Sequence, residues 1–422
     1  MKFYFKIFKL YFLLFFVANI QSQFLYVPEN IKSVRVQCNG TNTNFINLGE
    51  TIEFSFDDLE ADEKYYYYQI THHDYDWNPS TAKKSDYLEG FDDNRIKVVK
   101  NSFNTLVPYT NYKLRIPNND LKIKASGNYS ISIHLSNGEK IFEKYFSVID
   151  QQYQIQMSIS RSNLIDNIDS VQKLKIILNC NDCSEIYNNS SELKIIVIKN
   201  QNLNDSKILN KPKFIMSNSL IYDDIIFSGG NEFLNFDNSK IKQTNYRILR
   251  SSLEKIYNTY LDTDIDRTND VYKYGPDING NFKINFSANR DEIENDYAKV
   301  HFKFKPDKIV EKRDIYLIGS FNNFQINSYN KLNFNSKKMI YEGSFLFKQG
   351  FYDYIYGYID TKNQNKLETY GGNFWQTENE YQVLLFHKKI NDKFFKIIGQ
   401  NSLSSTKINN WKRLLFFSKY IY

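Results

Sequence analysis

The sequence predicts an all-β protein built from tandem β-sandwich domains. Tyr and Phe supply 67 of the 422 residues whereas Ala is scarce, a balance that favours strands with aromatic cores over helices. Apolar runs are short and end in turns rich in Asn, Ser and Gly, which is typical of strands. At about 400 residues after a predicted leader, the chain is longer than one core supports, so we expect two to four domains.

The N-terminus has the pattern of a secretory signal peptide, which we place at residues 1–22. Three lysines precede an apolar run at 10–20, and Ser22 supplies a small residue near the cleavage point. The run is shorter than the roughly 20 apolar residues that span a bilayer, so we expect no transmembrane helix in the mature chain. Without the leader, the basic and acidic residues nearly balance and are interspersed, which does not indicate a nucleic-acid partner.

A first β-sandwich is predicted at residues 23–150. Four consecutive tyrosines at 65–68 favour a strand, a polar turn follows at 72–80, and Gly90 marks a second turn. Residues 129–135 alternate apolar and polar, Asn137-Gly138 turns the chain, and 141–149 form the return strand. This hairpin ends the predicted first domain.

A middle β-rich domain is predicted at residues 151–300. Apolar runs at 174–178 and 193–198 are separated by Asn- and Ser-rich turns, as expected of strands. Residues 250–260 are the exception, because their apolar positions have helical spacing. We therefore expect one short helix there.

A third β-sandwich is predicted at residues 301–399, followed by a tail at 400–422. Its turn at 319–324 and its strand beginning G-F-Y-D-Y at 350 resemble the early-set immunoglobulin-like sandwich of glycogen- and starch-binding modules. Four tyrosines at alternate positions from 352 to 358 share one face of that strand, and we expect them in the core. The apolar, basic tail is either an amphipathic segment or disordered.

Several motifs of the first domain belong together. They read H-x-D-W-N-P-S at residues 73–80, with one residue inserted, Y-L-x-G-F at 87–91, S-F-N-T at 102–105 and Y-T-x-Y-x-L-x-I-P-N at 109–118. This set resembles the plug protein of the type IX secretion system of Bacteroidetes. The resemblance implies a periplasmic protein, without enzymatic activity or cofactor, that docks on the inner side of the outer-membrane translocon barrel and seals it.

The turns of the first domain hold the candidate site residues. Loops on a rigid scaffold often carry recognition, and Trp and Tyr dominate binding hot spots. The other interpretation is structural, with Asx turns at the two aspartates and the Trp wedged against the domain. The residues for which both interpretations stay open are Asp74, Asp76, Trp77, Asn78, Pro79 and Phe91.

Three patterns suggest a metal, and in each the structural interpretation is preferred. His72 and His73 offer imidazoles beside the carboxylates of Asp74 and Asp76, but neighbouring side chains on a strand face opposite ways. Cys180 and Cys183 form half a zinc site without a second pair, so a local disulfide or two buried thiols is expected. The run D-T-D-I-D at 262–266 lacks the Gly and the final acid of an EF-hand.

Other functions rank lower. No nucleophile, zinc-protease or phosphate-loop motif is present, so we predict no catalytic residues. The main alternative is an exported α-glucan-binding protein, which is weakened because Phe324 stands where that family has Trp. A further alternative, cargo of the same secretion route, would need a Gly-rich C-terminal sorting domain that the tail does not resemble.

Overall fold

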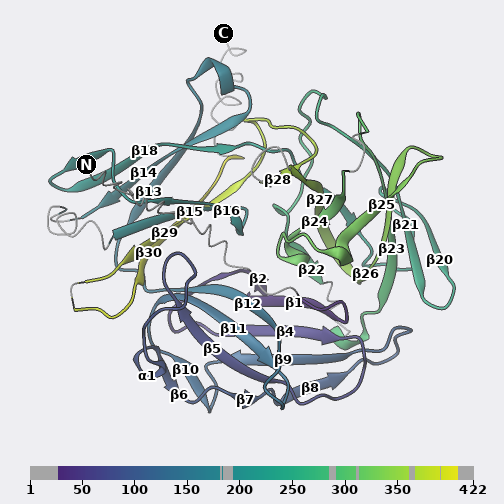
Figure 1. Ribbon diagram of the computed structural model, residues 1–422, viewed down its shortest axis with the longest axis horizontal. Coiled ribbons are helices and arrows are strands. Elements are labelled where there is room, and N and C mark those ends of the chain that lie inside the picture. The colour runs from purple at the N-terminus through teal and green to yellow at the C-terminus, as the bar shows by residue number, and fades with distance from the viewer. Residues whose placement is uncertain are drawn as a thin grey trace, which may run out of the picture.

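The structure is a computed structural model that describes residues 27–180, 183, 193–284, 291–309, 313–360, 366–389 and 391–406. The predicted signal peptide and residues 407–422 of the predicted tail lie outside these ranges. The described elements are nearly all strands, gathered into three lobes (Figure 1), which confirms the predicted all-β sandwich fold. In this part of the chain, no helix is both long and apolar enough to cross a membrane.

The first lobe is a sandwich of two five-stranded sheets with a small two-stranded sheet beside them. The sheet orders are β2-β1-β4-β9-β8, β3-β12-β11-β5-β7 and β10-β6. Its elements are β1 (Ile31–Cys38), β2 (Thr41–Asn42), β3 (Phe45–Asn47), β4 (Ile52–Asp58), β5 (Tyr67–His73), α1 (Lys84–Tyr87), β6 (Leu88–Gly90), β7 (Asn94–Arg95), β8 (Val98–Asn101), β9 (Thr110–Ile116), β10 (Leu121–Ile123), β11 (Gly127–His134) and β12 (Lys140–Ile149).

Strand alternation decides which residues of this lobe form its core. Phe54 and Phe56 of β4 face inward, where they pack against Phe142 of β12. Because successive side chains point to opposite faces, Ser55 and Asp57 face outward, toward the third lobe. The predicted hairpin of β11 and β12 is present and contributes to the same core.

The second lobe packs two four-stranded sheets, ordered β13-β14-β18-β17 and β16-β15-β29-β30. Its core is aliphatic, with Tyr381 and Phe227 as its ring contact. Its elements are β13 (Ile155–Arg161), η1 (Ile165–Asn167), β14 (Val171–Asn179), β15 (Leu193–Lys199), β16 (Asn202–Leu209), β17 (Phe214–Met216), β18 (Ser219–Ser228), β29 (Glu380–His387) and β30 (Lys396–Ser404).

The third lobe is one curled path of strands around an aromatic core, ordered β19-β27-β24-β25-β26-β23-β21-β20, with β22 and β28 also paired to β27. Its elements are β19 (Leu234–Asp237), β20 (Ile248–Leu253), β21 (Tyr257–Ile265), β22 (Phe282–Ile284), η3 (Glu292–Glu294), β23 (Tyr297–Lys305), β24 (Ile315–Ile318), η4 (Ser320–Asn322), η5 (Ser328–Asn330), β25 (Lys331–Asn335), β26 (Ile340–Lys348), β27 (Gly350–Asp360) and β28 (Lys366–Thr369).

Strand pairing crosses the limits predicted at residues 300 and 399. β19 to β22, placed by the sequence in a 151–300 domain, pair within the third lobe, and β29 pairs with β15 of the second. The predicted tail at 400–422 begins inside β30. β29 is buried on both faces, so either neighbouring core could accept it. We propose a three-lobe division that follows these pairings.

The helix expected at residues 250–260 is wrong. The segment forms the hairpin of β20 and β21, and β21 also pairs in parallel with β23. Pairing on both sides satisfies the backbone of β21, which outweighs the spacing of a few apolar side chains.

Candidate functional site

The loop after β5 is closed by its own hydrogen bonds. Asp74 N donates to Asn78 O at 2.9 Å, Trp77 N donates to Asp74 O at 3.0 Å, and Pro79 forms a bridge with His73. The carboxylate of Asp76 accepts from Asn78 N at 3.2 Å, which is the predicted Asx turn. These contacts fix the loop from within.

The carboxylate of Asp74 has a different role from the predicted Asx turn. It accepts from Phe395 N at 3.4 Å, across the junction with the second lobe. Trp77, half-buried with a φ of +65°, packs its ring edge-on against Tyr145 at 5.3 Å. The loop therefore contributes to the folded chain on both sides.

The two histidines of the motif face opposite ways, as expected. His73 uses both ring nitrogens, with Trp77 O at 2.9 Å and Ser130 Oγ at 2.8 Å. His72 Nδ1 lies 2.9 Å from Ser80 Oγ, and burial lowers the pKa of His72 to about 3, so the ring is neutral. A Cβ at Gly127 would lie 2.1 Å from His72 Nε2, which explains the glycine there.

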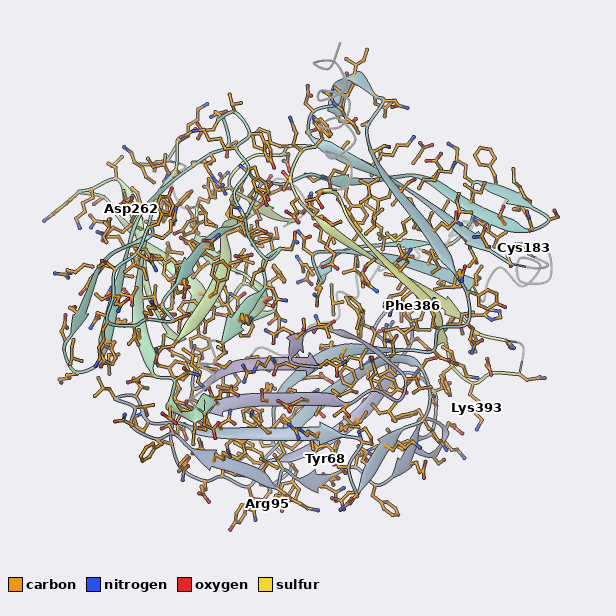
Figure 2. All side chains as sticks on the ribbon, turned by 180° about the vertical axis from the view of Figure 1, so that it is seen from behind. Tyr68, Arg95, Cys183, Asp262, Phe386 and Lys393 are labelled. Carbon is orange, nitrogen blue, oxygen red and sulfur yellow. A yellow bond between two sulfur atoms is a disulfide. The ribbon has the colours of Figure 1, made fainter. Side chains whose placement is uncertain are left out.

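The same loop rests on the connection between β29 and β30. The ring of Phe394 lies 4.5 Å from that of His72, and Phe395 lies 4.9 Å from Tyr75. Lys393, seen at this junction in Figure 2, pairs with Asp86 at 2.9 Å. His72, Asp74 and Tyr75 thus join the first and second lobes.

The turn at Gly90 and Phe91 presents a different surface. Gly90 has a φ of +91°, and a Cβ there would lie 2.2 Å from Asp120 O, so the turn requires glycine. Phe91 is 82% exposed and Tyr65 is 54% exposed, with the guanidinium of Arg95 3.6 Å from the Tyr65 ring centroid. We call Tyr65, Phe91 and Arg95 the aromatic rim; Figure 2 shows Arg95 at the edge of the first lobe far from the other lobes.

A buried ionic cluster, which the sequence did not predict, joins the first and third lobes. Asp57 and Lys348 are fully buried, and their charged atoms lie 2.8 Å apart. Asp57 also accepts from Tyr297 Oη at 2.7 Å and from Asn111 Nδ2 at 2.7 Å. Asp57 and Lys348 are 291 residues apart, so no local pattern could reveal the cluster.

Glu292 completes this cluster. It pairs with Arg35 and with Lys113, the latter at 3.0 Å, and lies 3.8 Å from Lys348. Burial lowers the pKa of Lys348 to about 8 against the opposing charge of Asp57. Opposite charges compensate one another here, which is the condition for keeping ions in a protein interior.

One group of acids in the described part of the chain has oxygens close enough to share a cation. It consists of Asp58, Glu60 and Asp62. Lys64 Nζ lies 2.9 Å from an oxygen of Asp58 and 3.5 Å from one of Asp62, and it also forms an ion pair with Glu60. The ammonium thus takes the position of a cation, and we assign no metal site to these acids.

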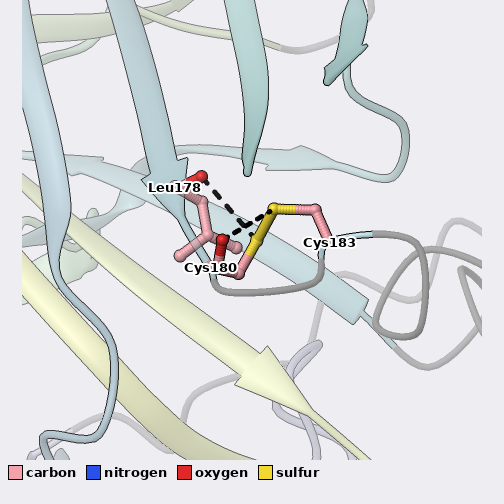
Figure 3. The surroundings of a disulfide bond; sticks show 3 residues. All are labelled: Leu178, Cys180 and Cys183. Atoms are coloured by element: carbon pink, nitrogen blue, oxygen red, sulfur yellow. Dashed lines mark hydrogen bonds between the residues drawn. A yellow bond between two sulfur atoms is a disulfide. The ribbon is translucent and has the colours of Figure 1, made fainter. Parts of the chain in front are cut away.

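The segments considered as a calcium loop, half a zinc site and a sugar-binding turn have structural roles. Asp264, in the former calcium-loop candidate, lies on β21 and accepts from Tyr354 Oη at 2.8 Å and Tyr356 Oη at 2.7 Å in the core. Cys180 and Cys183 are joined by a local disulfide (Figure 3), one of the two predicted outcomes. Phe324, in the turn compared with sugar-binding modules, is 6% exposed and packs in an apolar cluster with Ile318 and Ile355 of its own lobe, so it offers no platform for a sugar ring.

Comparison with known proteins identifies the first lobe. Residues 31–150 match the family model described as type 9 secretion system plug protein 1st domain. The first lobe belongs to this plug family. The resemblance predicted from the motifs is thereby confirmed, and the plug domain connects the chain with type IX secretion.

The architecture of the plug-domain protein recurs in a solved structure. The crystal structure of a hypothetical protein from Parabacteroides merdae ATCC 43184, at 2.30 Å resolution, is similar with a TM-score of 0.84 and 28% sequence identity. The similarity covers 91% of this chain and 100% of the other. No curated protein matches the chain. The three-lobe arrangement is therefore shared well beyond the plug domain.

Proposed function

We propose that this protein is a non-enzymatic periplasmic plug, which docks on the inner side of the outer-membrane translocon barrel of the type IX secretion system and seals it. The match of residues 31–150 to the plug family carries this proposal. A pore wide enough for folded cargo would leak solutes, so a reversible stopper is needed. Strand-built lobes with buried junctions suit that role, because docking a rigid body costs little conformational entropy.

The aromatic rim is our candidate for the surface that contacts the barrel. The loop at 74–80 is engaged by the second lobe, whereas Phe91 projects from a turn held by Asp120. Tyr and Arg are enriched in binding hot spots, and a stacked Arg is already partly ordered before binding. The roles of Asp74, Asp76, Trp77, Asn78 and Pro79 are in this proposal structural.

We expect the double variant Phe91→Ser/Arg95→Glu to lose its binding to the translocon barrel. The tagged full chain is purified from its own cell envelope in mild detergent, and the accompanying proteins are identified by mass spectrometry. The wild type should recover a very large outer-membrane β-barrel, and the variant at least tenfold less, since each hot-spot residue contributes about 2 kcal/mol.

The matched control is Tyr246→Ser, which removes an equally exposed ring from the third lobe. It should recover the barrel as the wild type does. If the tagged wild type is purified without the barrel from envelopes in which the barrel is abundant, the docking proposal is refuted. Equal recovery by the rim variant would refute only the choice of surface.

A further inference from the structure

A pocket lies where the three lobes meet. In Figure 1 the position is marked by β2 and β12 below, β16 above and β22 beside them. It is partly open to solvent. Its walls come from all three lobes, so it exists only in the assembled molecule.

The pocket is lined by a half-buried lysine of the first lobe. Lys144 of β12 shares the inner face of the first lobe with Phe142 and Phe146, because these residues alternate with outward ones. Its ammonium reaches the pocket and donates to Asn323 Oδ1 of the third lobe at 2.6 Å. Burial lowers the pKa of Lys144 to about 8, so the group is still charged at pH 7.

This charge has no opposite charge beside it. In the described ranges, no carboxylate lies within 4.0 Å of Lys144 Nζ, whereas Lys348 of the ionic cluster has Asp57. A desolvated ammonium that meets only a neutral amide is costly. An anionic group entering the pocket would remove that cost.

A carboxylate from the second lobe faces the same pocket. Glu380 shares a face of β29 with Leu384 and Phe386, which pack toward the first lobe. Its carboxylate makes no ion pair with any described residue, and burial raises the pKa of Glu380. The pocket thus carries one unpaired charge of each sign, on different lobes.

Amides and rings line the rest of the pocket. Asn279 Oδ1 is buried without a hydrogen-bond partner among the described residues, so it can accept a hydrogen bond from a ligand. Gln201 and Asn281 add further amides, and Phe282 and Phe324 supply apolar wall. A peptide offers each matching group: a carboxylate, an ammonium, backbone N–H donors and a side chain.

We propose that the three-lobe pocket binds a short peptide with free termini. Its carboxylate pairs with Lys144, its ammonium pairs with Glu380, and an N–H donates to Asn279 Oδ1. A neutral sugar would use the amides but would leave both charges unpaired, so the observations favour the peptide. The inference is independent of docking on the barrel.

The test uses the full chain with a tripeptide library, from which retained tripeptides are recovered by ultrafiltration and identified by mass spectrometry. Calorimetry then compares one retained tripeptide in three forms. C-terminal amidation and N-terminal acetylation should each weaken binding at least tenfold, because each removes a charge-assisted hydrogen bond. This comparison needs only the wild-type protein.

Variants locate the site. Lys144→Met keeps the aliphatic side chain and removes the charge, so C-terminal amidation should no longer weaken tripeptide binding to this variant. In the same way, N-terminal acetylation should no longer weaken binding to Glu380→Gln. Lys255→Met, at an exposed lysine of the third lobe, should bind as the wild type. Retention of no tripeptide at millimolar concentration, binding indifferent to blocked termini, or retention of neutral sugars instead would overturn the proposal.

Discussion

Asp57 is the residue on which the contact between the first and third lobes most depends. It accepts three hydrogen bonds, one of them from the buried ammonium of Lys348. Removing one member of a buried ion pair costs more than the pair contributes, because the remaining charge stays desolvated. An exposed ion pair at the same junction, Lys100 with Asp291, has no such cost.

We therefore expect Asp57→Ala to lower the free energy of unfolding by about 3–5 kcal/mol. Lys100→Ala, the matched control across the same two lobes, should change it by less than about 1 kcal/mol. Urea denaturation followed by circular dichroism measures both. Equal effects of the two substitutions would contradict the assignment of the buried cluster as the main ionic contact.

The hairpin of β29 and β30 is the element that joins most of the molecule. It completes a sheet of the second lobe, and Phe394 and Phe395 of its connection pack against His72 and Tyr75 of the first. Phe386, seen between these two lobes in Figure 2, lies in the apolar cluster at the same junction. The hairpin thus fixes the plug domain against the rest of the chain.

Phe394→Ala should destabilise the protein by about 3–5 kcal/mol, since it removes a buried ring and leaves a cavity beside His72. Phe91→Ala removes a ring of the same kind from an exposed turn and should cost no more than about 0.5 kcal/mol. Thermal unfolding of the two variants gives the comparison. A small effect of Phe394→Ala would show that the connection only rests on the first lobe.

At the scale of the whole molecule, each pair of lobes has its own buried junction. The first and third share the ionic cluster, the first and second share rings, and the second and third meet around Glu232. Glu232 accepts from Tyr272 Oη and from Glu378 N, and its second oxygen is buried without a partner among the described residues. Burial raises the pKa of Glu232 to about 7, and the charges of Asp277 and Glu378 add to this.

This raised pKa makes stability depend on pH. The folded protein keeps the Glu232 proton up to about pH 7, whereas the unfolded chain releases it near pH 4.5. The stabilisation is complete below the unfolded pKa and is lost as pH rises through the folded one. Between pH 5 and 7 the free energy of unfolding should therefore fall with rising pH, and Glu232 should account for up to about 1.4 kcal/mol of this fall per pH unit. The Glu232→Gln variant should lack that part of the fall.

Urea denaturation at several pH values checks this slope. Glu89→Gln, which alters an exposed carboxylate of the first lobe, serves as the control and should keep the wild-type decline. A Glu232→Gln variant with an unchanged slope would mean that the junction does not hold the proton.

The sequence by itself determined the class of fold, the hairpin of β11 and β12 and the family of the first lobe. These follow from local signals: alternation in β11, the Asn137-Gly138 turn, and the glycine that the turn at Gly90 requires. Only the tertiary structure decided which strand pairs with which lobe, and that His72, Asp74 and Tyr75 contact the second lobe. A strand such as β29, apolar on both faces, fits more than one neighbour. Likewise the environments of Asp57, Lys348 and Lys144 depend on groups 179 to 291 residues away, because burial and charge pairing are properties of the assembled surfaces.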